Sequence, residues 1–138
     1  MKATLKKVGK IAFEVTTESG HTLVTDGSPN NGGENAGPRP MELVLSALGG
    51  CSGIDVALIL EKSRQQVTDC TIEIDATRAD AVPAVFTDIH VHYTVTGRDL
   101  DPKRVARAVA LSVEKYCSVT RMLEKSVNIT HSFNIEDA

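Results

Sequence analysis

Apolar and polar residues alternate with a period of two in the first part of the chain. The segment 11–15 alternates in this way, and residues 18–20 supply a turn before a second arm at 21–25. Alternation of this kind is typical of half-buried strands, so the segment predicts a hairpin. Residues 27–40 contain seven Gly or Pro, which predicts a mobile surface loop.

A change of period predicts a long helix over residues 40–62. Apolar or small residues recur there mostly at steps of three and four, and they surround almost the whole helix. We therefore expect this helix to be buried. Gly49, Gly50 and Gly53 lie inside it, and each costs about 1 kcal/mol relative to Ala. We interpret them as a point where another helix crosses beside Cys51.

The rest of the chain contains strands and helices in blocks. Strand patterns occur at 70–77, 85–95 and 127–135. Between the last two, Asp101 has the character of an N-cap with Pro102 at the first helical position. Another short helix is expected to begin near Cys117. This order predicts an α+β fold with largely antiparallel strand pairing.

The length of 138 residues predicts a single domain over 1–138. Helix 40–62 is difficult to cover completely in so small a chain, which favours a symmetric homodimer.

Composition excludes several functional classes. The net charge is −3 and the pI about 5.8, so nothing indicates binding to nucleic acid or to an anionic membrane. The first residues lack the apolar core of a secretory signal. No uninterrupted apolar run reaches about 18 residues, so we expect no membrane span. We therefore expect a cytoplasmic protein.

The three cysteines are the main candidates for chemistry. An odd number without CxxC spacing, in a compartment that keeps thiols reduced, favours reactive thiols over a disulfide framework or a zinc site. Cys51 lies among small residues that leave its sulfur accessible, although a small buried hydrophobe is the alternative. Cys70 lies in the apolar row of a strand and is interpreted as structural.

Cys117 stands where a helix is expected to begin. Backbone N–H groups and the helix dipole would favour its thiolate there. Arg121 follows four residues later and would add positive charge on the same face. The alternative is a buried cysteine at a helix junction.

The histidines offer a weaker metal signal. His90 and His92 project from one strand face, and His131 lies on another strand. A third ligand with a fitting carboxylate is not evident. We therefore interpret them as solvated or core-edge histidines and predict no metal and no cofactor.

Two motifs resemble the OsmC/Ohr family. Residues 40–52 are similar to the family's first-cysteine helix, and residues 114–119 to its second-cysteine motif, and the spacing of 66 positions from Cys51 to Cys117 also fits. Residues 98–100 and 128–133 most resemble the YhfA branch of the family. The resemblance implies an intertwined α+β homodimer with two long central helices and antiparallel sheets wrapped outside.

The resemblance also implies an activity in oxidative stress defence. Family members reduce organic hydroperoxides or hydrogen peroxide. By position, Cys51 would attack the peroxide and become a sulfenic acid, and Cys117 would resolve it as a disulfide. A cellular dithiol would then reduce that disulfide, and no cofactor is needed.

One family position differs. The Glu that the family pairs with an activating Arg is replaced by Met41, so Glu42, Arg39 and Arg121 are the remaining candidates for activating or binding residues. Without an activating pair, the same dimer could be a non-catalytic protein that holds a small apolar or thiol ligand. A structural dimer with inert cysteines is the third possibility.

Overall fold

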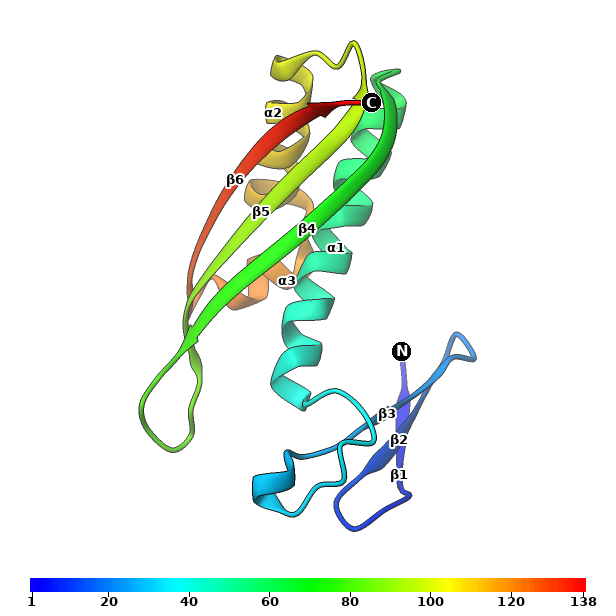
Figure 1. Cartoon of the computed structure of the whole chain (residues 1–138), viewed down its shortest axis with the longest axis vertical. Helices are drawn as coiled ribbons and strands as arrows, with labels where there is room; N and C mark the ends of the chain where they lie inside the picture. The colour runs from blue at the N-terminus through cyan, green and yellow to red at the C-terminus, as the bar shows by residue number, and fades with distance from the viewer. The chain divides into compact units, whose positions relative to one another are not determined.

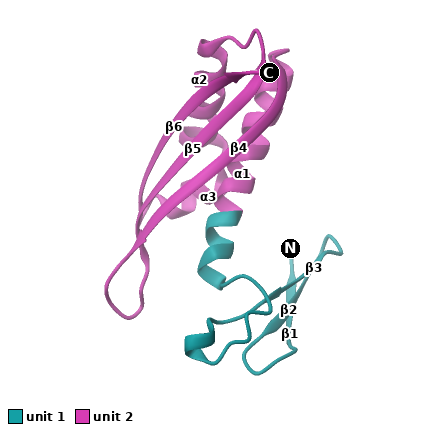
Figure 2. Ribbon diagram, viewed as in Figure 1, with its two compact units in different colours: residues 1–46 teal, residues 47–138 magenta.

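The computed structural model describes residues 1–138 and divides into two compact units, 1–46 and 47–138 (Figure 2). The prediction of one domain over the whole length stays a prediction. The elements in chain order are β1 (Ala3–Lys7), β2 (Phe13–Thr17), β3 (Thr22–Thr25), the 3-10 turn η1 (Pro29–Asn31), α1 (Pro40–Lys62), β4 (Gln66–Arg78), β5 (Phe86–Arg98), α2 (Pro102–Leu111), the π-helix η2 (Ser112–Tyr116), α3 (Ser118–Leu123) and β6 (Asn128–Asp137).

The first unit is a three-stranded antiparallel sheet in the order β1-β2-β3, followed by a loop. The predicted hairpin is confirmed as β2 and β3, whereas sequence reasoning missed β1. Asp26 shapes the loop because its carboxylate accepts hydrogen bonds from the backbone N–H groups of Gly27, Glu34 and Ala36 at 2.8–3.1 Å. Those bonds, from Glu34 above all, lower the pKa of Asp26.

The second unit contains the sheet β4-β5-β6. β4 and β5 pair antiparallel, but β5 and β6 run parallel. The expectation of largely antiparallel pairing is therefore confirmed for β1–β2, β2–β3 and β4–β5, and the β5–β6 pair is the exception. The reason lies in the connection, because α2, η2 and α3 come between the two strands, and a helical crossover returns the chain in the same direction.

The core of the second unit lies on one face of this sheet. Figure 1 shows α1 and α2 against the same side of the three strands. Every second residue of β5 points into that layer. The buried residues there are Ile89, Val91, Tyr93 and Val95 from β5, Leu48, Ser52, Val56 and Leu60 from α1, and Val105, Ala108 and Val109 from α2.

Helix α1 has the predicted bounds but not the predicted burial. Only a stripe at four-residue steps is buried, while the side chains of Ile54 and Leu58 are 63% and 48% exposed. An 18-residue window of this helix has a mean hydropathy of 2.0, so by length and composition it could cross a membrane. The expectation of no membrane span stays a prediction, because a helix that packs in a protein core can have the same length and composition.

The glycines of α1 adjoin the sheet and not a second helix of the same chain. A Cβ at Gly49 would lie 3.0 Å from Ile74 Cδ1, and one at Gly53 would lie 2.7 Å from Ile72 Cδ1. A Cβ at Gly50 would meet nothing within 4 Å. Two of the three glycines therefore admit isoleucines of β4, and the interpretation as a helix crossing is wrong for them.

Candidate functional site

Folding brings Cys51, Asp55 and Cys117 together in the second unit. The two Sγ atoms and a carboxylate oxygen of Asp55 all lie within 4.8 Å of one another. Cys51 and Asp55 are four residues apart on α1, so they share one face of the helix. Cys117 enters from the start of α3. All three cysteines of the chain are free thiols, so the two sulfurs of the cluster are close without being bonded.

The local backbone explains the position of Cys117. The π-helix η2 ends there, with Cys117 N donating to Ser112 O at 2.8 Å. Cys117 is the N-cap of α3, and its Sγ accepts a hydrogen bond from Thr120 N at 3.4 Å. A sulfur at this point satisfies one of the free N–H groups of the helix start.

The environment of Cys117 favours the neutral thiol. Its side chain is fully buried, and this burial is the largest effect that raises the pKa of the thiol. Hydrogen bonds from Thr120 lower the pKa, and the neighbouring Cys51 raises it further. The expectation of a thiolate at Cys117 is therefore wrong. The helix start does lower the pKa of this thiol, but the loss of water on burial raises it by more.

Asp55 is a member of the cluster that sequence reasoning did not assign. Ser112 Oγ lies 3.1 Å from Asp55 Oδ2 and 3.2 Å from Ser52 O, so its single proton can serve either acceptor. None of the ion pairs of the chain includes Asp55. The sequence did contain a signal for this role, because Asp55 is a carboxylate inside an otherwise apolar helix and lies one turn after Cys51.

Tyr93 lies beneath the cluster with an unpaired hydroxyl. The residue is fully buried, and its Oη has no hydrogen-bond partner. Burial raises the pKa of the phenol, the nearby Ser52 hydroxyl lowers it, and the charges of Cys117, Cys70 and Asp55 raise it. Ser52 is therefore close to the phenol, but its hydroxyl donates to Gly49 O at 3.4 Å and does not complete a bond with Tyr93.

The predicted activating residues have other partners. Glu42 Oε1 accepts from Arg39 N at 2.8 Å at the start of α1, and Arg39 donates its guanidinium hydrogens to Asn35 Oδ1 and Gly37 O. These contacts all lie within the first unit.

Arg121 is also engaged away from the sulfurs. It donates to Glu114 O at 3.1 Å and forms an ion pair with Glu124 at 3.0 Å. No lysine or arginine is hydrogen-bonded to the cluster or ion-paired with it. A role for Arg39, Glu42 or Arg121 beside the cysteines stays a prediction.

The remaining candidates from the sequence lie elsewhere. Cys70 is on β4, and burial, followed by the charge of Asp69, raises the pKa of its thiol. Both ring nitrogens of His90 and of His92 are hydrogen-bonded at 2.7–2.8 Å to hydroxyl or amide side chains of β6. These bonds form a polar ladder on the outer face of the sheet, which agrees with the interpretation of partly solvated histidines.

A cavity of about 480 Å³ opens beside the cluster. Its lining is Asp55, Leu58, Ile59, Lys62, Leu111 and Tyr116. Asp55 therefore lies within 4.8 Å of both sulfurs and also lines an apolar space of the size that takes small ligands.

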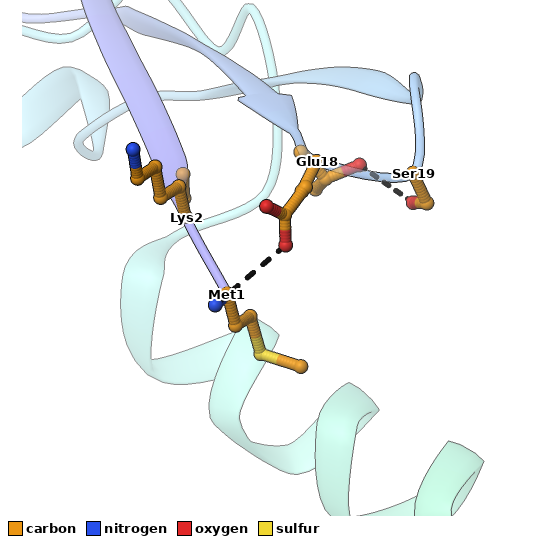
Figure 3. Close-up of a pocket in the computed structure, with 6 residues that line it drawn as sticks. Met1, Lys2, Glu18 and Ser19 are labelled. Atoms are coloured by element: carbon orange, nitrogen blue, oxygen red, sulfur yellow. Dashed lines mark hydrogen bonds and ion pairs between the residues drawn. The ribbon is translucent and has the colours of Figure 1, made fainter.

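Another cavity lies at the end of β1 and β2 and is lined by residues 1–3 and 17–19 (Figure 3). Its polar contacts are an ion pair of 3.6 Å between the Met1 amino group and Glu18, and a hydrogen bond of 2.9 Å between Thr17 and Ser19. It contains no cysteine, so it offers no thiol chemistry.

Comparison with known proteins places this geometry among relatives. A family model described as an OsmC-like protein matches residues 32–132. Protein YhfA of Escherichia coli (strain K12) is 52% identical over 135 residues, which cover 98% of this chain and 98% of that protein. A solved structure of a hypothetical protein from Aquifex aeolicus VF5 shares 33% identity and a TM-score of 0.88, covering 99% of this chain and 96% of that one.

A more distant solved structure has a descriptive name. The organic hydroperoxide resistance protein OhrB of Bacillus subtilis has a TM-score of 0.63 and 20% identity, and the match covers 96% of each chain. At this identity the likeness shows a shared fold. Together these matches confirm the predicted α+β architecture and the resemblance on which it rests.

Proposed function

Because this chain belongs to the OsmC-like family, we propose that it is a thiol-dependent peroxidase for organic hydroperoxides or hydrogen peroxide. The observation that carries the proposal is the approach of Cys51 and Cys117, whose sulfurs lie within 4.8 Å although the residues are 66 positions apart in the sequence. A fold relative is named for hydroperoxide resistance. A two-cysteine mechanism requires a pair of sulfurs that are close but unbonded in the reduced state.

Exposure supports different roles for the two cysteines. Cys51 is partly accessible, whereas Cys117 is fully buried. A peroxide arriving from solvent therefore reaches Cys51 first. In the proposed reaction the Cys51 thiolate attacks one peroxide oxygen, the O–O bond breaks, and the alcohol or water leaves with a proton. Cys51 is then a sulfenic acid.

Cys117 completes the proposed cycle. Its thiol attacks the sulfenic sulfur, an S–S bond forms, and the oxygen leaves as water. A disulfide needs the sulfurs about 2.05 Å apart, so a short approach from within 4.8 Å is sufficient. A cellular dithiol then reduces the disulfide and restores both thiols, which balances the electrons taken by the peroxide.

Asp55 is the proposed proton acceptor in the first step. Its carboxylate lies within 4.8 Å of both sulfurs, which permits transfer directly or through one water. Ser112 orients the carboxylate by its hydrogen bond of 3.1 Å. Asp55 thus provides a carboxylate beside Cys51, whereas Met41 occupies the position of the Glu that the family pairs with an activating Arg.

The test is turnover of tert-butyl hydroperoxide by the purified protein with a dithiol reductant. We expect Cys51→Ser to abolish turnover and Cys117→Ser to accumulate a sulfenic acid that dimedone traps. Cys70→Ser is the matched control and should retain full activity, because this thiol lies outside the cluster. If Cys51→Ser consumed peroxide as fast as the unmodified protein, the mechanism would be wrong.

The cavity beside Asp55 supports a second candidate function, which is ligand binding without catalysis. Its walls are mainly apolar side chains, with one carboxylate and one ammonium group at Asp55 and Lys62. Such a site suits a small apolar or thiol ligand. Native mass spectrometry separates the two functions, because a retained ligand without peroxide consumption would favour binding.

A further inference from the structure

The cluster of Cys51, Asp55 and Cys117 has the composition of a metal-ligand set. Two sulfurs and one carboxylate oxygen converge within 4.8 Å of one another from two separate elements. Thiolates select thiophilic ions, and zinc accepts carboxylate oxygen in the same shell. Mg²⁺ and Ca²⁺ prefer all-oxygen sites, so this donor set disfavours them.

We propose that the reduced protein binds one Zn²⁺ ion, or a divalent cation of the same class, through Cys51 Sγ, Cys117 Sγ and a carboxylate oxygen of Asp55. Zinc bonds of about 2.3 Å to sulfur and 2.0–2.2 Å to oxygen place tetrahedral donors roughly 3.5–3.8 Å apart. The donors lie within 4.8 Å of one another, so each pair needs to approach by at most about 1.3 Å to reach that spacing. Each thiol releases its proton to solvent as its bond to the cation forms.

Hydrogen bonds outside the donor set already orient two of the ligands. Ser112 Oγ donates to Asp55 Oδ2 at 3.1 Å, and Thr120 N donates to Cys117 Sγ at 3.4 Å. Bonds of this kind fix the direction of metal ligands and reduce the cost of assembling them. The donors are thus held by the helix spacing and by fixed partners.

Charge and an unpaired polar group provide independent support. None of the ion pairs of the chain neutralises the Asp55 carboxylate, so its charge is available to a cation. Near the cluster, the fully buried Tyr93 hydroxyl has no hydrogen-bond partner. A zinc ion with three protein ligands keeps a fourth position for water, and a phenol next to it can bond to that water.

Metal binding and disulfide formation exclude each other at this site. Both states use the same two sulfurs, so a cation protects them from oxidation and a disulfide removes two of the three ligands. The inference does not depend on peroxide reduction, because it requires only the reduced sulfurs and the carboxylate.

The experiment titrates Co²⁺ and then Zn²⁺ into the reduced, full-length protein. We expect a tetrahedral cobalt–thiolate spectrum at one ion per chain, which zinc then displaces. Zinc affinity follows from competition with a chelating dye. Loss of an outer hydrogen bond in Ser112→Ala should weaken binding about 10- to 100-fold. Cys51→Ser and Asp55→Asn remove a ligand and should weaken it more.

Cys70→Ser is the matched control and should bind zinc as the unmodified protein does. The proposal is overturned if cobalt shows no thiolate charge-transfer band, or if Cys51→Ser retains that band. Subsequent addition of tert-butyl hydroperoxide separates the two proposals. Zinc bound with no peroxide consumed in the metal-free protein would refute only the peroxidase, and turnover without cobalt or zinc binding would refute only the metal site.

Discussion

Replacing Tyr93 with Phe should stabilise the reduced, metal-free protein. The Tyr93 ring is fully buried in the core between the sheet and α1, and its hydroxyl has no hydrogen-bond partner. A buried polar group without a partner costs about 1–3 kcal/mol, because it loses its bonds to water on folding. Tyr93→Phe removes that group and keeps the ring, so the packing is retained.

The expected gain is large enough to measure. The entropy of unfolding is about 2.1 cal/mol/K per residue, which for 138 residues is about 0.3 kcal/mol/K. A gain of about 1–3 kcal/mol therefore raises Tm by about 3–10 °C. Thermal and urea unfolding should be followed with a chelator and a reductant present, at equal protein concentration, since an oligomer makes Tm depend on concentration.

Tyr116→Phe is the matched control for this substitution. That side chain is 51% exposed, so the same loss of a hydroxyl should change stability by less than about 0.5 kcal/mol. If Tyr93→Phe lowered Tm while the control did not, the hydroxyl would have a partner in solution. The argument for an unsatisfied polar group beside the cysteines would then fail.

Three further predictions concern α1, α2 and the buried thiol. Gly50→Ala should raise the free energy of unfolding by up to about 1 kcal/mol, because a Cβ there meets nothing within 4 Å. The free energy of unfolding of Gly53→Ala, measured in urea, should be about 1–3 kcal/mol lower than that of Gly50→Ala, because a Cβ at Gly53 would lie 2.7 Å from Ile72 Cδ1. Equal values for the two variants would contradict that geometry. Asp101→Ala should cost about 1 kcal/mol, because it removes the N-cap bond of 2.9 Å at the start of α2; an unchanged melting curve would argue against the cap. Burial raises the pKa of Cys117 in the folded chain, so the stability that the neutral thiol contributes is complete below the ordinary pKa of 9.0 and is lost as pH rises through the folded value. Cys117→Ala should reduce this loss of stability at alkaline pH, measured as the free energy of unfolding at pH values below and above 9.0. The same dependence of stability on pH in Cys117→Ala and in the unmodified protein would refute the burial effect.

The local elements were predictable because their signals are local. The bounds 40–62 follow from a change of period after a loop rich in Gly and Pro, and the Asp101 cap follows from residue type and the adjacent Pro102. β5 shows where such reasoning ends. Sequence alternation puts Thr87 in the inward row, but a register shift against β4 at 77/78 leaves Thr87 exposed. A single bulged residue reverses the face to which the preceding residues of the strand point.

The site was predictable only in part because it depends on contacts between distant segments. Sequence motifs named Cys51 and Cys117, and the structure brings their sulfurs together. Asp55 was not assigned, since its proximity to Cys117 follows from the contact of η2 with α1, where Ser112 Oγ meets Ser52 O and Asp55 Oδ2. The expected thiolate at Cys117 failed for a related reason. A helix start is visible in a sequence, whereas the burial that outweighs it is a property of the folded chain.

The thiol site and the uncovered face of α1 belong to one surface. Helical spacing puts Ile54, Asp55 and Leu58 within two turns of Cys51 on the same side, and Ile54 and Leu58 are 63% and 48% exposed. Apolar area of this kind is stabilised when another surface excludes water from it, and a second copy of the chain is the partner that we propose. Such a copy would also form a wall of the cavity beside Asp55. Assembly would then restrict which peroxides and which cations reach the sulfurs, so the state of the oligomer and the reactivity of Cys51 would be set by the same face of one helix.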